Sequence, residues 1–553
     1  MAETLLCVPI FVDSPEQALA DARAAKERGA DIVEFRIDRC FDGSSGDDEQ
    51  DAYLVRQLQA LIADSPLPVV LTCRSADEGG EFDGDDSERV ALLEKLTAAA
   101  NVQPAYMDIE QAAYSRSANI RQKIHLCVQH ADQQRPVTTR LITSSHDFET
   151  RPTDLVRTLF AMREEPTPAV IKIAHRARSI RDNLELFDLL AARDRPTVAL
   201  GMGEFGVMSR ILAPKFGAFL TFASLRNEDA TAPGQPAIDE LLDVYNFRSI
   251  NENTRVLGIV GWPVAHSASP LVHNAAFKAA GIDAVYVPLP VYGTGAADDG
   301  SYESLKATLD ELITHPRLDF AGASVTLPHK EHLVRYAKDK GLSMEAGAEL
   351  IGAANTIAVQ RDGLGTSTHA RVSNTDASAI VSCLVDALGD LADRRVAVVG
   401  VGGVGRAAAV ACADAGAAVT VFNRTHAKAE RLAADLAGKT AGTVVAEPLA
   451  ALPDLAADAF INCTSVGMAG GPAPDASSLP IDAIVERGVV SPAAVFFDTV
   501  YTPRVTPMLA AADAAGFRTI DGVGMFIHQA EAQFFTWTGK GVPPGLFAQL
   551  LTG

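Results

Sequence analysis

Short apolar runs rich in β-branched residues recur along the first 224 residues of the chain. Helix-like segments lie between them, such as residues 14–29, where Ser14 is suited to cap a helix and Gly29 to end one. Strands that alternate with helices in this way predict a closed (β/α)8 barrel better than an open sheet. The predicted strands are LLCVPIFV (5–12), DIVEFRID (31–38), PVVLTCRS (68–75), AYMDIE (105–110), LITSSHDF (141–148), AVIKIAH (169–175), PTVALGM (196–202) and FGAFLTFA (216–223).

A second α/β pattern begins after a polar segment, NFRSINENT (246–254), which lacks hydrophobic periodicity and predicts a linker. Residues 395–425 then show the order strand, glycine-rich turn, Ala-rich helix and strand. A helix N-terminus and a close backbone approach accommodate a pyrophosphate, so this order predicts a Rossmann-type lobe that binds a dinucleotide. The glycines of the turn are Gly400, Gly402, Gly403 and Gly405.

Composition excludes several classes of protein. The 553 residues are enough for about three domains. With 48 Lys+Arg against 70 Asp+Glu, the formal net charge is −22, which argues against binding to nucleic acid or to an anionic membrane surface. The seven scattered cysteines form no CxxC pair, which favours reduced thiols and a cytoplasmic location. No apolar run has the length of a membrane span, we see no targeting peptide, and no spacing of ligand-type residues predicts a metal site.

The predicted barrel carries charged residues where such barrels place their chemistry, at the C-terminal strand ends. Lys172 lies inside the apolar run AVIKIAH, where desolvation disfavours its ammonium and favours a nucleophilic amine. The alternative is a lysine paired with a carboxylate. His146 on the neighbouring strand is suited to be a general base, with Glu78 to orient it. Three guanidinium groups are suited to hold a carboxylate or hydroxyls: Arg36, Arg74 and Arg210.

Six motifs in this half, in order, resemble those of type I 3-dehydroquinate dehydratases: DIVEFRID, TCRSADEGG, SSHDF, IKIA, MGxxGVMSR and TAPGQ. The resemblance covers residues 1 to about 245. It implies that Lys172 forms a Schiff base with the ring ketone of 3-dehydroquinate, that His146 removes and relays protons, and that Glu78 supports His146. It also implies substrate binding by Glu34, Arg36, Arg74, Arg210, Gln235 and Thr231, the last where the family often has Ser.

The second half resembles shikimate dehydrogenases in GWPVAHSASPLVHN (261–274), SVTLPHK (324–330), GAANTI (352–357), SNTD (373–376), INCTSVGM (461–468), FDTVYTPRVTPML (497–509) and DGVGMFIHQA (521–530). By this resemblance Lys330 and Asp376 form the catalytic pair. Hydride delivery to a ketone leaves an alkoxide, which a nearby ammonium must protonate. An isolated pair of this kind is more often a salt bridge. The residues implied to bind substrate are Ser267, Ser269, Thr326, Asn355, Tyr501 and Gln529.

Two features of the second half qualify this resemblance. The family commonly has glycine where this chain has Val372 and Ala377, which raises the question of how the local turn forms, since valine disfavours positive φ. At the end of the strand after the glycine turn, NAD enzymes usually have Asp or Glu. This chain has Asn423, Arg424 and Thr425, which suit a 2′-phosphate and predict NADP(H) as the cofactor.

The order of the two halves resembles bifunctional dehydroquinate dehydratase/shikimate dehydrogenase proteins, in which 3-dehydroquinate gives 3-dehydroshikimate and NADPH then reduces it to shikimate. We expect small-molecule partners only, and leave the oligomeric state open, a monomer included. The alternatives are a class I aldolase-like Schiff-base barrel, a quinate-specific second half, or a scaffolding protein with decayed sites. The expected domains are a barrel at 1–245, a linker at 246–254, a substrate lobe at 255–370 completed by helices at 525–553, and a Rossmann lobe at 371–524.

Overall fold

The computed structural model describes residues 3–40, 48–97, 102–128, 139–295, 298–361 and 368–552. The chain divides into two compact units. The first consists of Met1–Arg255 with Asp283–Pro290 and His315–Asp319, and the second of Val256–Ile282, Val291–Thr314 and Phe320–Gly553.

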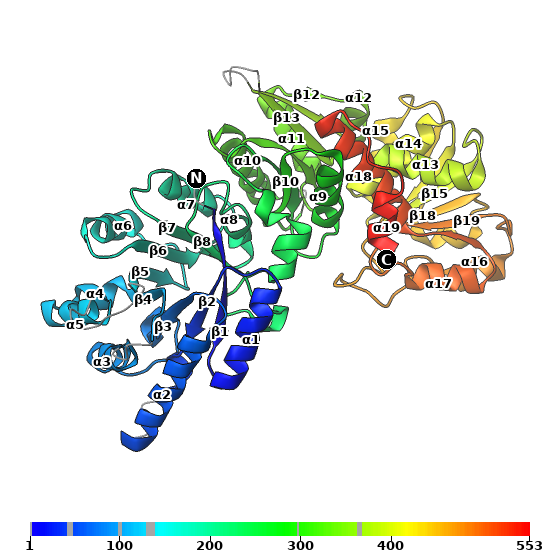
Figure 1. Cartoon of the computed structure of the whole chain (residues 1–553). Helices are drawn as coiled ribbons and strands as arrows, with labels where there is room; N and C mark the ends of the chain where they lie inside the picture. Colours follow the sequence, from blue (N-terminus) through cyan, green and yellow to red (C-terminus); the bar gives the residue numbers. More distant parts are fainter. Residues whose placement is uncertain are drawn as a thin grey trace. The chain divides into compact units, whose positions relative to one another are not determined.

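Eight parallel strands form the core of the first unit (Figure 1). Their order is β7-β6-β5-β4-β3-β2-β1-β8, and β1 pairs with both β2 and β8. Between β7 and β8, Phe219 N–H donates to Thr197 O at 2.8 Å, which nearly closes the barrel. The predicted barrel is therefore confirmed. Its strands are β1 (Leu5–Phe11), β2 (Ile32–Arg36), β3 (Val69–Thr72), β4 (Tyr106–Glu110), β5 (Arg140–Asp147), β6 (Val170–Arg176), β7 (Thr197–Met202) and β8 (Leu220–Phe222).

Helices lie outside these strands (Figure 1). The first helix begins as its sequence predicts, since Ser14 Oγ accepts a hydrogen bond from Gln17 N–H at 3.4 Å, and the chain turns at Gly29 with φ +94°. The helices of this unit are α1 (Pro15–Glu27), α2 (Asp48–Asp64), α3 (Asp86–Thr97), α4 (Gln111–Arg116), α5 (Ala118–Val128), α6 (Leu155–Glu164), α7 (Asp182–Ala191) and α8 (Val207–Ile211).

The register of the strands places polar side chains in one layer inside the barrel. Ser144 pairs with Lys172 across β5 and β6, and Thr72 pairs with Asp108 across β3 and β4. Side chains alternate along a strand, so the residues two positions earlier face the same way, about 6.6 Å deeper. Those residues are apolar and buried, and include Val70, Ile142 and Val170. A polar layer therefore lies above an apolar floor.

The segment 246–254, for which the sequence predicts a linker, is ordered against the first unit. Phe247 is buried, and Arg248 forms an ion pair with Asp31 at 2.9 Å. The Lys215 ammonium donates to the carbonyl oxygens of Glu252 and Thr254, both at 2.8 Å. The polar residues of this segment therefore take part in an ion pair and in main-chain hydrogen bonds.

The second unit contains two lobes, each built on its own sheet. The first, which we call the mixed-sheet lobe, has the strand order β10-β9-β11-β13-β14-β12, with parallel and antiparallel pairs; its edge strand β10 lies in the stretch Asp283–Pro290, which groups with the first unit. Its strands are β9 (Arg255–Gly261), β10 (Ala284–Pro290), β11 (Phe320–Val325), β12 (Ser343–Met344), β13 (Thr356–Arg361) and β14 (Thr368–Ser373). Its helices are α9 (Ser269–Ala280), α10 (Asp299–Thr314), α11 (Lys330–Lys340) and α12 (Ala346–Ile351).

The second lobe, the parallel-sheet lobe, has the strand order β17-β16-β15-β18-β19-β20, and its strand pairs are parallel. This is the doubly wound order of dinucleotide-binding folds, so the predicted Rossmann-type lobe is confirmed. Its strands are β15 (Arg395–Val399), β16 (Ala418–Phe422), β17 (Thr443–Ala446), β18 (Ala459–Asn462), β19 (Val495–Asp498) and β20 (Arg518–Ile520). Its helices are α13 (Asp376–Leu388), α14 (Gly403–Asp414), α15 (His426–Leu436), α16 (Ile481–Arg487) and α17 (Pro507–Ala514).

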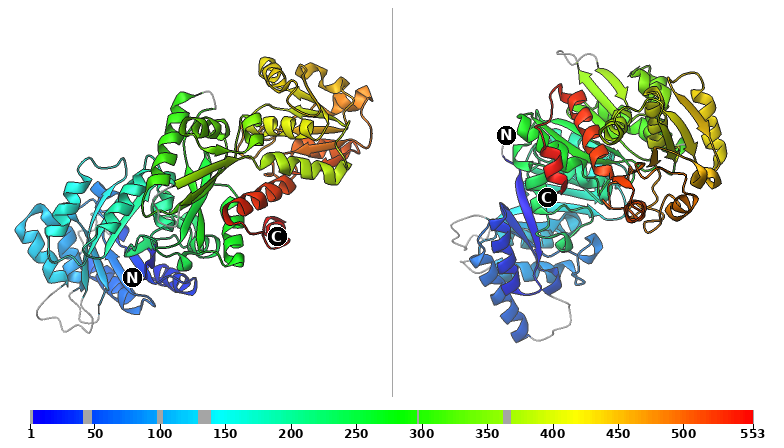
Figure 2. Two further views of the ribbon diagram at one scale, coloured as in Figure 1. Left: turned by 90° about the horizontal axis from the view of Figure 1, so that it is seen from above. Right: turned by 90° about the vertical axis from the view of Figure 1, so that its right-hand side faces the viewer.

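The chain returns to the mixed-sheet lobe at its C-terminal end, through α18 (Gly522–Thr538) and α19 (Leu546–Thr552). Helix α18, red in Figure 2, packs against β11, β13 and α13. The Trp537 indole donates to Ile357 O on β13 at 3.1 Å. Within the described part of the chain, no helix is long and apolar enough to cross a membrane.

Candidate active sites

Lys172 is the central group of the polar layer in the barrel. Its ammonium lies 3.0 Å from Asp108 Oδ2 and 3.5 Å from Glu34 Oε1, and 4.6 Å from the centre of the Phe222 ring. The side chain is 7 % exposed. The lysine is therefore buried and paired with carboxylates.

Asp108 and Glu110, both on β4, hold Arg74 in place. The Arg74 guanidinium lies 3.0 Å from Asp108 Oδ1 and 3.0 Å from Glu110 Oε1, and also donates to Ser144 Oγ at 2.8 Å. Burial favours the neutral form of Asp108, but the positive charges of Arg74 and Lys172 outweigh it and hold the pKa of Asp108 well below its ordinary value. The positive charge of Arg74 is thus balanced by carboxylates of the protein, and Arg74 does not depend on a substrate carboxylate for its counter-ion.

His146 and Glu78 form the pair that the sequence predicts. Glu78 Oε2 accepts the His146 backbone N–H at 2.8 Å and lies 3.0 Å from His146 Nδ1. Burial, together with the charges of Arg74 and Lys172, lowers the pKa of His146 well below its ordinary value, so the imidazole is neutral at pH 7. When Glu78 is ionised, Nδ1 must carry the hydrogen, and Nε2 is left as a base. Burial raises the pKa of Glu78 to about 7.

Glu34 and Arg36 lie two positions apart on β2, so their side chains face the same way. Glu34 accepts a hydrogen bond from the Thr72 hydroxyl at 2.8 Å, in addition to its approach to Lys172. Arg36 forms a two-pronged pair with Asp38, with both hydrogen bonds at 2.8 Å. Arg36 therefore has an internal partner, which the sequence did not indicate.

Arg210, on α8, differs from the other two arginines. It is buried, its Nε has no hydrogen-bond partner among the described residues, and burial lowers its pKa to about 10. The amide of Gln235 is similar, since its Nε2 is buried without a partner there while its Oε1 accepts from the Thr231 N–H and hydroxyl, both at 3.1 Å. A buried cation without a counter-ion favours an anionic ligand.

In the second unit, Lys330 and Asp376 are brought together from different helices. Lys330 is the first residue of α11 and Asp376 the first of α13, and the ammonium lies 2.5 Å from Asp376 Oδ2. Both residues are buried. The other carboxylate oxygen, Oδ1, accepts a hydrogen bond from Asn355 Nδ2 at 2.9 Å. The carboxylate therefore has a fixed orientation toward the lysine.

Asn355 uses both ends of its amide within the protein. Its Oδ1 accepts from the Thr375 N–H at 2.9 Å, and its Nδ2 donates to Thr375 Oγ1 at 3.0 Å as well as to Asp376. Its backbone oxygen accepts from Gln533 Nε2 at 3.2 Å, and Ser324 Oγ donates to Gln533 Oε1 at 2.7 Å. In this structure Asn355 therefore orients Asp376, and helix α18 supports it through Gln533.

The remaining predicted substrate residues lie on several elements of this unit. Ser267 Oγ accepts the Ser269 N–H at 3.2 Å, and Ser269 begins α9. Burial raises the pKa of Tyr501, opposed by a side-chain hydrogen bond to Ser267. Gln529 donates to Phe526 O at 3.1 Å within α18, and Thr326 follows β11. Ser267, Ser269 and Tyr501 thus form one cluster, whereas within the described part of the chain no hydrogen bond joins the side chain of Thr326 or Gln529 to it.

The two departures from the dehydrogenase pattern cause no backbone strain. Val372 lies inside β14, where it pairs with Ile357 and is fully buried, and Ala377 is the second residue of α13. Neither is among the described non-glycine residues with positive φ. The turn is made by Asn374, whose Oδ1 accepts the N–H groups of Asp376 at 3.0 Å and Ala377 at 3.3 Å.

The glycine turn of the parallel-sheet lobe has the shape that a dinucleotide requires. Gly400 follows β15 with φ +99°, and a Cβ on Gly405 would lie 1.9 Å from Gly400 O. Nothing lies within 4 Å of a Cβ built on Gly402, where a diphosphate would approach the N-terminus of α14. After β16, Arg424 and Thr425 are exposed, and Asn423 Nδ2 donates to Thr425 O at 2.9 Å. These residues fit an NADP-type dinucleotide.

Comparison with known proteins supports the resemblance found for each half of the chain. The sequence model of the Type I 3-dehydroquinase family matches residues 6–252. Models described as the shikimate dehydrogenase substrate binding domain, shikimate / quinate 5-dehydrogenase and the shikimate 5′-dehydrogenase C-terminal domain match residues 259–357, 383–469 and 522–551. The chain is 35 % identical to the chloroplastic bifunctional 3-dehydroquinate dehydratase/shikimate dehydrogenase of Arabidopsis thaliana, over 99 % of this chain and 84 % of that protein.

This chain belongs to the bifunctional 3-dehydroquinate dehydratase/shikimate dehydrogenase family. Its second half is also 38 % identical to the shikimate dehydrogenase (NADP(+)) of Citrifermentans bemidjiense, over 55 % of this chain and 96 % of that protein. A solved shikimate dehydrogenase in complex with NADP+ has 32 % identity and a TM-score of 0.46, over 54 % of this chain and 95 % of that chain. The aldolase-like alternative for the barrel receives no support from these matches.

Besides Asp38, sequence reasoning missed Asp108, Glu110 and Gln533. Asp108 and Glu110 stand inside the apolar strand YMDIE, which is an unusual place for carboxylates and was the available signal. Gln533 lies on α18, four residues beyond the predicted Gln529, so it lies on the same face of the helix. Among the described residues, no three His, Cys, Asp or Glu side chains gather in a way that could hold a metal ion.

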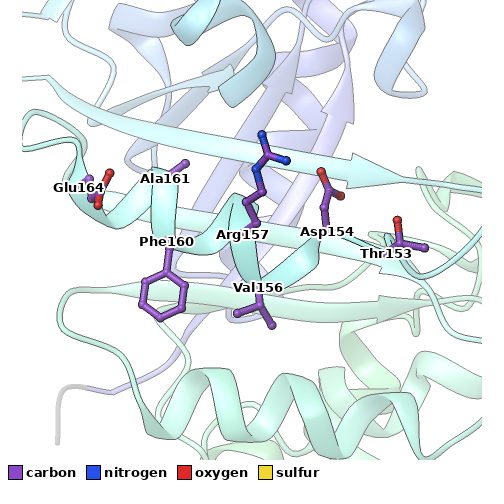
Figure 3. A pocket seen from close by; sticks show the side chains of 7 residues that line it. All are labelled: Thr153, Asp154, Val156, Arg157, Phe160, Ala161 and Glu164. Atoms are coloured by element: carbon purple, nitrogen blue, oxygen red, sulfur yellow. The ribbon is translucent and has the colours of Figure 1, made fainter.

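A surface depression on α6 lies apart from the predicted residues (Figure 3). It is lined by Thr153, Asp154, Val156, Arg157, Phe160, Ala161 and Glu164. All seven belong to one helix and the turn before it, so no second element among them encloses a ligand. Val156 and Phe160 are 47 % and 58 % exposed. The buried clusters around Lys172 and Lys330 are therefore the better candidates for catalysis.

Proposed function

We propose that the residues around Lys172 dehydrate 3-dehydroquinate to 3-dehydroshikimate, and that those around Lys330 reduce this product to shikimate with NADPH. The observation that carries the proposal is that one chain holds both a buried Lys172 beside a neutral His146 and a buried Lys330–Asp376 pair near a dinucleotide turn. Purified protein given dehydroquinate and NADPH tests it. Shikimate formation with matching loss of NADPH is expected, and its absence would refute the proposal.

The first step begins with Lys172. Neutral His146 is suited to take the ammonium proton, after which the amine attacks the ring ketone. The histidine returns this proton to the carbinolamine hydroxyl, which leaves as water and gives an iminium, and His146 is neutral again. The iminium withdraws electrons and acidifies the adjacent C–H, from which His146 removes a proton. The β-hydroxyl then leaves as water, protonated by the same histidine, and hydrolysis of the imine releases the enone and restores Lys172.

Substrate orientation in the barrel is assigned to the buried groups that lack internal partners. Arg210 binds the carboxylate, and Gln235 with Thr231 binds the ring, because their unpartnered or half-partnered groups gain hydrogen bonds when substrate is present. Arg74 and Arg36 act mainly by fixing the carboxylates of Asp108 and Asp38. Glu34 is close enough to Lys172 to stabilise the positive charge of the iminium.

In the second step the bound NADPH supplies the hydride that reduces the ketone. Lys330 protonates the oxygen that becomes the new hydroxyl, and Asp376 orients Lys330. Ser267, Ser269 and Tyr501 hold the substrate carboxylate, with Thr326, Asn355 and Gln529 near the ring. Gly400, Gly402, Gly403 and Gly405 would hold the diphosphate, and Asn423, Arg424 and Thr425 the 2′-phosphate.

The domain limits proposed for this function are a barrel at 1–245, a linker at 246–254, a substrate lobe at 255–370 with residues 525–553, and a Rossmann lobe at 371–524. Contacts of Gln533 and Trp537 with Asn355 and Ile357 support the assignment of the C-terminal helices. A cytoplasmic location is proposed because the seven cysteines are scattered along the sequence and form no CxxC pair.

Replacing Glu78 by Gln is expected to alter the pH dependence of dehydration. Burial raises the pKa of Glu78 to about 7, so its ionised form, which accepts the His146 Nδ1 hydrogen, increases as the pH rises through 7. Dehydratase kcat/KM should therefore rise between pH 6 and 8 in the native protein. In Glu78→Gln this rise should vanish, and activity at pH 8 should fall roughly tenfold, the scale of one charged hydrogen bond.

The exposed neighbour Asp77 supplies the control for this variant, since Asp77→Asn changes a carboxylate in the same turn. Its pH profile should match that of the native protein. A profile that keeps its rise near pH 7 in Glu78→Gln would mean that another group titrates there.

Replacing Arg424 by Ala is expected to weaken NADPH binding by about 1.5 to 3 kcal/mol, the scale of a lost charged hydrogen bond. NADH binding should change little because NADH lacks the 2′-phosphate. Fluorescence titration with both cofactors measures the effect, with Arg431→Ala, an exposed arginine on α15, as the control. Equal losses for NADPH and NADH would show that Arg424 does not contact the 2′-phosphate.

A further inference from the structure

Arg406 lies on the helix that begins at the glycine turn, and its side chain reaches the other lobe of the second unit. It is the fourth residue of α14, one turn after the N-terminus. Its Nε donates to the carbonyl oxygen of Ile351, the last residue of α12, at 2.6 Å. A cation at the C-terminal end of a helix also interacts favourably with the unpaired carbonyl groups there.

Gly352 makes room for this contact. It ends α12 with φ +70°, and a Cβ built on it would lie 2.9 Å from Arg406 Nη2 and 3.6 Å from Nε. Any larger residue would have to displace the guanidinium or the helix end. The sequence thus has a glycine where both the backbone conformation and the side chain of Arg406 require one.

The residues that follow Gly352 form hydrogen bonds with both residues proposed to catalyse the reduction, Lys330 and Asp376. Ala354 N–H donates to Lys330 O at 2.9 Å, and Asn355 Nδ2 donates to Asp376 Oδ1 at 2.9 Å. Ala353 O accepts a hydrogen bond from Asn374 Nδ2, also at 2.9 Å. Ala353 and Ala354 are fully buried. A displacement of Gly352 would therefore be transmitted to Lys330 and Asp376.

The same helix also touches Lys330 directly. A Cβ built on Gly403, the first residue of α14, would lie 3.0 Å from Lys330 Cδ and 3.1 Å from Lys330 Cβ. The first turn of α14 thus contacts the Lys330 stem at Gly403 and the end of α12 at Arg406. Two contacts from one turn fix both the separation and the rotation of the helix relative to the catalytic pair.

We infer that Arg406 is a positioning residue for the reduction, which aligns the glycine turn with Lys330 and Asp376 through its hydrogen bond to Ile351 O. This inference rests on the proposed function of the second half. The rival role for Arg406 is electrostatic, since it forms no ion pair with a described residue and its charge lies near the expected diphosphate. The two roles require different properties of the side chain.

Three substitutions separate a hydrogen bond at the Nε position from the positive charge. In Arg406→Gln, the amide nitrogen occupies the position of Nε, so the donor remains and the charge is lost. In Arg406→Lys, the charge remains and the donor moves one bond further along the side chain. Arg406→Met has similar length and neither property. Each variant is made in the full chain, where dehydratase activity provides an internal measure of folded protein.

Steady-state reduction of dehydroshikimate by NADPH gives kcat and both KM values, and (4-²H)-labelled NADPH gives the isotope effect on kcat. We expect Arg406→Gln to stay within about twofold of native kcat, and Arg406→Met to lose roughly tenfold, the scale of one hydrogen bond. Arg406→Lys should lie between them. The KM for NADPH should change by less than about threefold, while the isotope effect on kcat rises in Arg406→Met because the chemical step has slowed.

Three results would overturn the inference. One is native kcat in all three variants. Another is the reverse order, with Arg406→Lys active and Arg406→Gln impaired mainly in KM for NADPH, which assigns a role to the charge. The third is an equal loss of kcat in Gln and Met variants. Arg406→Gln keeps the hydrogen-bond donor and Arg406→Lys keeps the charge. The order of their kcat values therefore distinguishes the two roles even if Arg406→Met does not fold. An inactive native protein would refute the proposed function itself.

Discussion

Replacing Lys172 by Ala is expected to lower dehydration of 3-dehydroquinate by on the order of 10⁶-fold, as when a covalent catalyst loses its nucleophile. The amine that forms the imine is then absent, and no other described lysine lies in the polar layer of the barrel. Appearance of the conjugated enone, followed by its ultraviolet absorbance, measures the loss. Reduction of added dehydroshikimate by the same protein should remain near the native rate and serves as the internal control.

Borohydride supplies a second measurement on the native protein. Added together with dehydroquinate, it should reduce the imine and leave a stable adduct on the peptide that contains Lys172. Lys26→Ala, which removes an exposed lysine on α1, should be modified and inactivated like the native protein. An adduct located elsewhere, or normal turnover in Lys172→Ala, would contradict the Schiff-base mechanism.

Replacing Lys330 by Ala is expected to lower reduction of dehydroshikimate by about 10² to 10⁴-fold, the usual contribution of a general acid. The new alkoxide then has no ammonium to protonate it, and the Asp376 carboxylate is left buried without its counter-ion. Oxidation of NADPH, followed by absorbance, measures the change. Dehydration of dehydroquinate should be unaffected.

Lys338 provides a matched control for this variant, because it is an exposed lysine on the same helix, α11. Lys338→Ala should reduce dehydroshikimate at close to the native rate. If Lys330→Ala were as active as Lys338→Ala, the proton would have to come from another group, and the Lys330–Asp376 pair would be a structural salt bridge.

The periodicity of apolar residues was sufficient to predict the barrel and the Rossmann-type lobe. Runs such as AVIKIAH alternate with amphipathic segments, and this alternation has few stable solutions. The mixed-sheet lobe was harder to foresee in detail. Its order places β13 between β11 and β14 and returns helix α18 from the end of the chain, and no local pattern encodes such long-range pairing.

The candidate site was predictable where a residue is unusual for its place in the sequence. Lys172 in an apolar strand and Lys330 in SVTLPHK are of this kind. The hydrogen-bond and ion-pair partners of the site residues were not predictable in the same way, because they depend on the register between strands. Thr72 must align with Asp108, and Ser144 with Lys172, before Arg74 is seen to be neutralised by Asp108. The distinction between paired Arg74 and unpaired Arg210 therefore required the structure.

At Val372 the missing glycine suggested a strained turn, and the structure shows no strain there. A missing glycine predicts trouble only if the position needs positive φ, and here the position is a buried strand residue. The side chain of Asn374 caps the N-terminus of α13 instead, so the following helix begins correctly without glycine on either side.

Complementation between variants tests whether one chain carries two complete and separate active sites for successive reactions. Lys172→Ala and Lys330→Ala are each given dehydroquinate and NADPH, alone and mixed in equal amounts, and shikimate is measured by chromatography. Neither variant alone should form shikimate at an appreciable rate, whereas the mixture should, because dehydroshikimate released by Lys330→Ala is reduced by Lys172→Ala. A mixture that stays inactive while both proteins are folded, or a single variant that completes both steps, would contradict the presence of two complete and separate sites.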